Sequence, residues 1–170
     1  QATGDWLRAK LNQLGLLGRK AIVLLPHNDV TMRMLALPDS DNRALPDLVR
    51  YQTSARSTVP VDQLVVDYMP LQKTMIDDGR CVLSAMVPVT LVQNLQECAN
   101  IAGIDLCAIG SSAVATCQVM AYLDSRGEPQ RNSRILVVFA AGKRMELSLL
   151  RGRDVLFSHV VRGGITEMKR

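Results

Sequence analysis

The sequence is poor in aromatic residues and has no long apolar run. Phe, Trp and Tyr make up 4% of its 170 residues, too few for the rows of side chains that stack on single-stranded nucleic acid. No stretch approaches the roughly 20 apolar residues of a membrane-spanning helix. A complete Walker-type phosphate loop, a Ser-His-Asp order and a paired-carboxylate motif are also missing. The composition that is present, 48% apolar and 21% charged, is typical of a globular domain.

Cysteine and histidine are scarce, and their spacing indicates no special chemistry. The four cysteines lie in apolar stretches without C-x-x-C spacing; they are Cys81, Cys98, Cys107 and Cys117. This pattern predicts mostly buried free thiols in a reducing compartment. His27 and His159 lie far apart in the sequence without a ligand motif around them. The sequence therefore predicts neither a disulfide nor a metal site.

Positive charge is concentrated near the end of the chain. Residues 126–170 carry ten basic and four acidic side chains, whereas residues 1–125 carry ten and twelve. Such a basic region could meet nucleic acid, anionic lipid, phosphate or an acidic partner. Its arginines are scattered and accompany no nucleic-acid-binding motif, so a solvated basic surface is the simpler interpretation. We do not expect nucleic acid as a partner.

Hydrophobic periodicity predicts a mixed α/β fold. Helices are expected at 5–17, 44–56, 90–102 and 112–123, and strands at 21–25, 30–37, 64–68, 81–87, 104–109, 135–140, 145–149 and 155–161. The second strand is expected to form a hairpin with the first, and a turn at 77–79 joins the third and fourth. The last helix is apolar almost all round, which predicts that it is buried.

A polar segment at 126–133 is the best linker in the sequence. It divides the chain into a first half, 1–125, and the start of a second half, 134–170, which begins with a three-strand meander. Only six residues follow Gly163-Gly164, so this second half is expected to be cut short. Without cover from the first half, another copy or further residues, apolar side chains of the meander would face water. They are Met145, Leu147, Leu149, Val155, Phe157 and Val161.

Several short segments stand in a characteristic order along nearly the whole chain. They are LGLLGRK at 14–20 before AIVLLP at 21–26, LALP at 35–38, VDQLVVDY at 61–68, VP at 87–88 before the helix that ends in AGI at 102–104, and VLFS at 155–158 before RGG at 162–164. Their order resembles the PilM family, actin-like proteins of type IV pilus assembly related to the cytoplasmic part of the type II secretion protein GspL. The resemblance implies an actin-like, ribonuclease-H-like segment with an inserted subdomain in its first half.

The resemblance also implies an ATP site between the two halves, but this sequence departs from the family pattern there. When Met145-Glu146-Leu147 is aligned with the family's Thr-Asp-Leu, Phe139 replaces the carboxylate, Ala141 the close-approach glycine and Met145 the hydroxyl. A degenerate nucleotide site would retain Gly142, Lys143, Arg144, Gly163 and Gly164. The segment 142–144 is equally an ordinary basic hairpin turn. Without a carboxylate to position metal and water, we expect no ATP hydrolysis and no cofactor. Binding of ATP and magnesium stays open for a longer chain.

The function that the resemblance implies is a non-catalytic cytoplasmic scaffold, peripheral to the bacterial inner membrane. Its expected partner is a membrane-anchored, PilN-like protein of a pilus or secretion system. A short cytoplasmic tail of that partner would bind in a groove of the first half, and self-association is a further expectation. The alternative is a nucleotide-binding actin-like ATPase with a degenerate phosphate loop. The residues at 139–145 are the feature that separates the two hypotheses.

Overall fold

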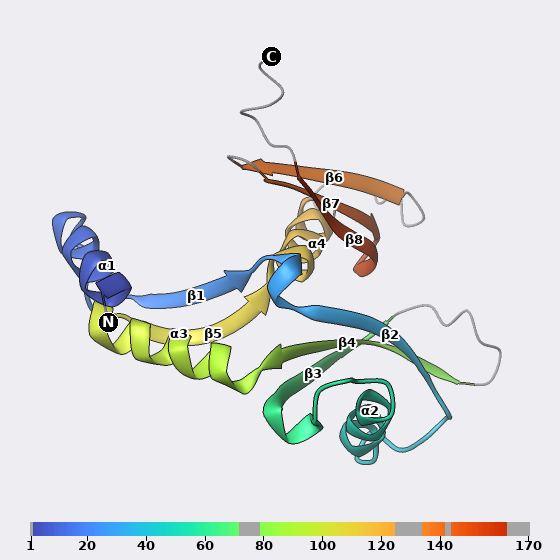
Figure 1. The fold of residues 1–170 in the computed structure, drawn as a ribbon. Helices are drawn as coiled ribbons and strands as arrows, with labels where there is room; N and C mark the ends of the chain where they lie inside the picture. The colour runs from blue at the N-terminus through green and yellow to red at the C-terminus, as the bar shows by residue number, and fades with distance from the viewer. Residues whose placement is uncertain (1, 72–78, 125–133, 142–143, 163–170) are drawn as a thin grey trace.

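The structure is a computed structural model that describes residues 2–71, 79–124, 134–141 and 144–162. Within these ranges the chain forms four α-helices and three small sheets (Figure 1). The helices are α1 (Ala2–Gln13), α2 (Leu45–Ser54), α3 (Val89–Ala102) and α4 (Ser112–Asp124). The strands are β1 (Lys20–Leu25), β2 (Thr31–Leu37), β3 (Leu64–Pro70), β4 (Arg80–Pro88), β5 (Asp105–Ser111), β6 (Arg134–Ala141), β7 (Arg144–Arg151) and β8 (Asp154–Arg162). Two 3-10 turns are η1 (His27–Asp29) and η2 (Val61–Gln63). The expected mixed α/β class is confirmed.

The first sheet pairs β1 with β5 in parallel, so the expected hairpin between residues 21–25 and 30–37 is wrong. A tight hairpin needs a short turn whose central residues adopt positive φ. Here Pro26 and η1 separate the two strands and carry the chain into another sheet, where β2 pairs with β4. The chain then passes through β3, β4 and α3 before β5 returns beside β1. That long crossover is what a parallel pair requires.

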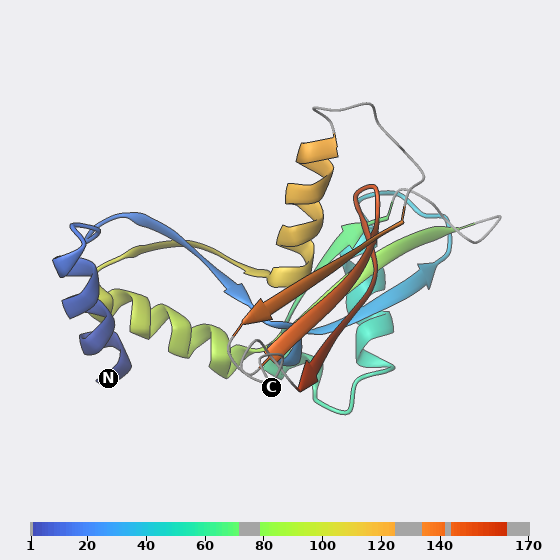
Figure 2. The ribbon, with the colours of Figure 1, turned by 90° about the horizontal axis from the view of Figure 1, so that it is seen from above.

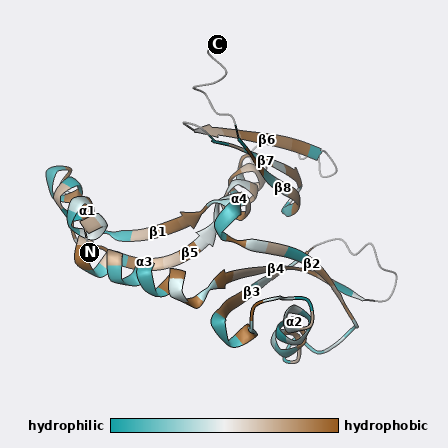
Figure 3. Ribbon diagram, viewed as in Figure 1, coloured by the Kyte–Doolittle hydropathy of each residue, from teal (hydrophilic) through white to brown (hydrophobic). Residues whose placement is uncertain are grey.

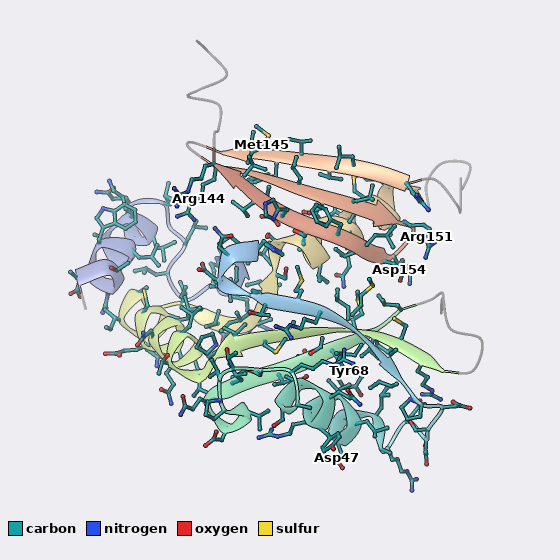
Figure 4. The ribbon with its side chains drawn as sticks, turned by 45° about the vertical axis from the view of Figure 1, so that its right-hand side comes forward. Asp47, Tyr68, Arg144, Met145, Arg151 and Asp154 are labelled. Atoms are coloured by element: carbon teal, nitrogen blue, oxygen red, sulfur yellow. The ribbon has the colours of Figure 1, made fainter. Side chains whose placement is uncertain are left out.

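The second sheet is antiparallel, with the order β2-β4-β3. The expected pairing of β3 with β4 is confirmed, although Asp77 and Asp78 of the expected turn lie outside the described residues. One face packs on α2 through Leu35, Val49 and Val82, each at most 1% exposed. Figure 4 shows Tyr68 on this side of the sheet, next to α2.

The third sheet is the expected meander, with the order β6-β7-β8. Figure 2 shows the third sheet crossing over the second sheet, with α4 beside them. Leu150 and Val155 of the third sheet, Cys117 of α4 and Leu83 of β4 belong to one buried cluster. β5 ends at Ser111 and α4 begins at the next residue, so no loop separates the strand from the helix. The expected linker at 126–133 lies outside the described residues.

The buried face of β7 is partly polar. Glu146, Ser148 and Leu150 are buried, whereas Met145, Leu147 and Leu149 are only half-buried. The Oγ of Ser112, the first residue of α4, lies 2.8 and 2.9 Å from the two carboxylate oxygens of Glu146 and donates to that carboxylate. A buried carboxylate is tolerated when it is hydrogen-bonded in this way. The third sheet thus packs against α4 and the second sheet through the face opposite to Met145, Leu147 and Leu149.

The other face of the third sheet is apolar and open within the described residues. Leu136 is 59% and Phe157 is 54% exposed. Figure 3 shows β6 as a largely hydrophobic ribbon. The sequence predicts that this sheet needs cover from other parts of the protein. The first half covers one face, and the other face stays uncovered within the described residues.

Two helices show why composition alone misjudges burial. α4 was expected to be buried, yet only the side carrying Ala113 and Cys117 is buried, while Val119, Tyr122 and Leu123 are more than half exposed. α1 is largely polar but packs closely on α3: a Cβ at Gly4 would lie 2.7 Å from Cγ2 of Ile101, which only glycine avoids. None of the described helices combines the length and apolar character that crossing a bilayer requires.

Candidate functional site

An apolar groove of about 390 Å³ lies between the first and second sheets, bordered by α3 and the start of α4. It exists because α4 covers only one end of this face of the second sheet. At that end, Leu83 and Met69 pack with α4 and the third sheet. The groove opens over the other end, where Val65, Ala85 and Val87 lie.

The floor of the groove follows from strand periodicity. Val65 pairs with Val87 and Met69 pairs with Leu83 in the antiparallel register, and residues paired in this way point to the same face. Val66, between them in the sequence, packs on the α2 side instead. The second sheet therefore has two apolar faces, one closed by α2 and one left as the groove floor.

One wall of the groove is the backbone edge of β5. Six consecutive residues, 106–111, line the groove. A strand that presents one face contributes every second residue, because successive side chains alternate. A consecutive run instead indicates that the strand presents its edge. Among the described strands, only β1 pairs with β5, so β5 offers unpaired N–H and C=O groups to an extended chain.

Polar side chains are few along the groove. Asp67 is the one charged residue among the described lining residues, and Gln96 and Ser111 add neutral polar groups. The Oδ1 of Asp67 accepts a hydrogen bond from the N–H of Tyr68 at 2.8 Å. No three His, Cys, Asp or Glu side chains in the described ranges could hold a metal ion together. An apolar floor, an open strand edge and one carboxylate suit recognition of an extended peptide better than bond-breaking chemistry.

Sequence reasoning named none of these groove residues as site residues. The available signal was Asp67 at the centre of an otherwise apolar strand, Leu64–Tyr68, where a charge is unusual without a functional or solvent-facing role. No sequence pattern indicated the open edge of β5, because that edge depends on which strand pairs with β1. That choice rests on contacts far apart in the sequence.

The expected nucleotide residues are only partly described. Gly142, Lys143, Gly163 and Gly164 lie outside the described residues. Arg144 is exposed at one end of the third sheet, opposite Arg162 in the register; Figure 4 shows it at the end of β7 far from Arg151. Phe139, which is expected at the carboxylate position of the PilM family, is 63% exposed and pairs with Glu146.

The cysteines are free, as expected, but differ in burial. Cys117 is buried, Cys81 and Cys98 are half-buried and Cys107 is exposed along the groove. The expectation that most are buried is thus wrong: β5 is an edge strand, and Cys107 lies on it. Burial, with a smaller contribution from the charge of Asp154, raises the pKa of Cys117 to about 11. The same two causes raise the pKa of Cys81.

His27 and His159 are brought together despite their separation in sequence. Their ring centroids lie 6.4 Å apart in an edge-on arrangement, and Phe157 stacks on His159 with centroids 6.0 Å apart. This small ring cluster joins η1 of the first half to β8 of the third sheet. It is a further contact between these regions, besides the buried cluster around Leu150 and the bond between Ser112 and Glu146.

Comparison with known proteins gives structural matches only. No family model and no curated protein matches the sequence. The structure is similar to one described as a PilM-PilN type IV pilus biogenesis complex, with a TM-score of 0.77 and 20% identity, covering 95% of this chain and 48% of that one. It is also similar to the cytoplasmic domain of EpsL, an inner membrane component of the type II secretion system of Vibrio cholerae, with a TM-score of 0.61, 12% identity and coverages of 94% and 55%. A Bacteroides thetaiotaomicron protein with an actin-like ATPase fold and unknown function follows, with a TM-score of 0.45, 11% identity and coverages of 88% and 50%.

These matches confirm, at the level of the fold, the resemblance that the sequence shows to PilM and the cytoplasmic part of GspL. The chain spans about half the length of the structures that it matches. It therefore corresponds to part of the fold seen in the PilM-PilN and EpsL structures.

Proposed function

We propose that this chain belongs to the cytoplasmic, inner-membrane-associated platform of a type IV pilus or type II secretion system, and that it acts there as a non-catalytic docking scaffold. Its groove would hold a short extended segment of a membrane-spanning partner, comparable to PilN. The observation that carries the proposal is the run of six consecutive β5 residues along an apolar groove. A peptide strand added to this edge would gain main-chain hydrogen bonds, while the floor would select its apolar side chains.

The structures with a similar fold support the choice of a type IV pilus or type II secretion system. One matched structure is a complex of PilM with PilN, and the other is the cytoplasmic domain of an inner membrane secretion component. The second name describes a cytoplasmic domain that belongs to an inner membrane component. The proposal transfers that arrangement to this chain.

The test is an array of short peptides that carry the cytoplasmic N-terminal segments of the source organism's single-span membrane proteins. We expect a small set to bind the wild-type chain and to protect the amides of residues 106–111 from hydrogen exchange. Ala85→Trp, which fills the groove floor, should abolish binding. Ala36→Trp is the matched control, because Ala36 lies on the same face of the second sheet but outside the groove. Equal binding by both variants would refute the proposal.

We also propose that the chain does not hydrolyse ATP. Phe139 occupies the position of the family's carboxylate, and the nearest acidic group in the register, Glu146, is buried and bound by Ser112. Neither is available to position a metal and its water. Calorimetric titration with ATP and magnesium, on this chain and on one extended beyond Arg170, should give at most weak binding. Micromolar affinity or measurable turnover would favour the alternative of an actin-like ATPase.

A further inference from the structure

Asp67 lies where a bound peptide would cover it. It pairs with Ala85 in the centre of the groove floor and shares its face with Val65 and Met69. β3 is an edge strand of the second sheet. The carboxylate accepts the N–H of Tyr68 and so lies beside the backbone of that edge, and both Asp67 and β5 line the groove.

Asp67 is exposed, so water solvates its charge. A peptide that covers the apolar floor would remove much of that water. An ionised carboxylate that loses water without gaining a partner is costly. No ion pair of Asp67 is seen within the described part of the chain, and the other polar lining groups named above, Gln96 and Ser111, are neutral.

We infer that the groove selects an extended peptide that carries a positively charged group opposite Asp67, flanked by apolar side chains. This inference rests on the proposed function and adds a rule of specificity to it. A lysine or arginine side chain, or a free N-terminal amine, would each provide the charge. Peptides with an acidic residue at the same place would be rejected, because two carboxylates would share a poorly hydrated site.

Two asparagine variants distinguish a role of the Asp67 charge in peptide binding from a purely structural role of this residue. Asp67→Asn keeps an oxygen that can accept the Tyr68 N–H but removes the charge. Asp62→Asn is the matched control, because Asp62 is an exposed carboxylate on η2 outside the groove. A merely structural role would make both asparagine variants behave alike.

The experiment uses the peptides that bind the wild-type chain in the array. One of them is synthesised in four forms: unchanged, with its basic residues replaced by glutamine, with them replaced by glutamate, and with an acetylated N-terminus. We expect Asp67→Asn to weaken binding of the unchanged form about tenfold, as for loss of a charge-assisted hydrogen bond. Asp62→Asn should leave binding unchanged. Asp67→Lys should prefer the glutamate form to the unchanged one.

Each outcome decides a different point. Loss of affinity on glutamine replacement assigns the charge to a side chain, and loss on acetylation assigns it to the amine. If peptides bind and Ala85→Trp abolishes binding, but Asp67→Asn and Asp67→Lys have no effect, the specificity rule is wrong while the proposed function stands. If no peptide binds the wild-type chain, both are wrong.

Discussion

The second and third sheets are built alike but are covered differently. Each has three antiparallel strands and two faces with apolar side chains. The second sheet closes one face with α2 and leaves part of the other as the groove. The third sheet packs its partly polar face on α4 and leaves an apolar face open within the described residues. The comparison teaches that side-chain polarity does not decide which face of a strand is buried; the helix that reaches it does.

The sharpest test of this difference is a leucine truncated in each sheet. Leu35→Ala in the second sheet removes a side chain that is 1% exposed and should lower the free energy of unfolding by about 2–5 kcal/mol. Leu136→Ala in the third sheet, where the side chain is 59% exposed, should change it by less than about 0.5 kcal/mol. Urea unfolding of both variants measures this. A large loss for Leu136→Ala would mean that another copy or segment covers the third sheet.

The buried polar contact on the third sheet provides the second test. Glu146→Gln replaces the carboxylate that accepts the Ser112 hydroxyl with a neutral amide, and we expect a loss of about 1–2 kcal/mol in the free energy of unfolding. Ser112→Ala should cost a similar amount. The double variant should lose less than the sum of the two, because each single change already breaks the contact. Additive losses in urea unfolding would show that the two residues act independently.

The open apolar face leads to a test of association. We expect the chain to self-associate at high concentration through this face, since exposed apolar patches favour contact between copies. Phe157→Asp places a charge on the face, where Phe157 is 54% exposed, and should shift the population toward monomer in sedimentation. Tyr51→Asp is the control, as Tyr51 is 70% exposed on α2, away from the third sheet. A wild-type chain that stays monomeric, with an ordered third sheet, would contradict the prediction.

The smallest effect on stability is expected from the ionisation of the cysteine thiols, which also differ in their rates of labelling. Labelling at mildly alkaline pH should be fastest at exposed Cys107 and slowest at Cys117, which is buried and has its pKa raised to about 11. Because the Cys117 thiol keeps its proton to higher pH in the folded chain than in the unfolded one, its contribution to stability is complete below about pH 9. That contribution is lost as the pH rises toward 11. Mass spectrometry of the labelled protein gives the order; rapid labelling of Cys117 would contradict it.

Local signals accounted for most of the elements. Gly103 ends α3 with a φ of 71°, and the periodicity of residues 44–56 gave α2 to within a few residues. The pairing of β1 was not predictable, because its partner β5 lies some 80 residues further along. The burial of Glu146 was also missed, since only the tertiary position of Ser112 makes a carboxylate acceptable there. The groove depends on the pairing of β1 with β5 and on the tertiary position of α4, so no motif in the sequence indicated it.

Because α4 follows β5 directly, the strand that forms the groove wall is rigidly connected to this helix. A rotation of β5, such as a strand added along its edge would impose, is passed to α4 without a loop to absorb it. A helix of 13 residues is about 20 Å long, so a tilt of about 5° moves its far end by roughly 2 Å. The third sheet, attached through Ser112 and Glu146 and packed along α4, would swing with it. Occupancy of the groove would thereby displace the third sheet.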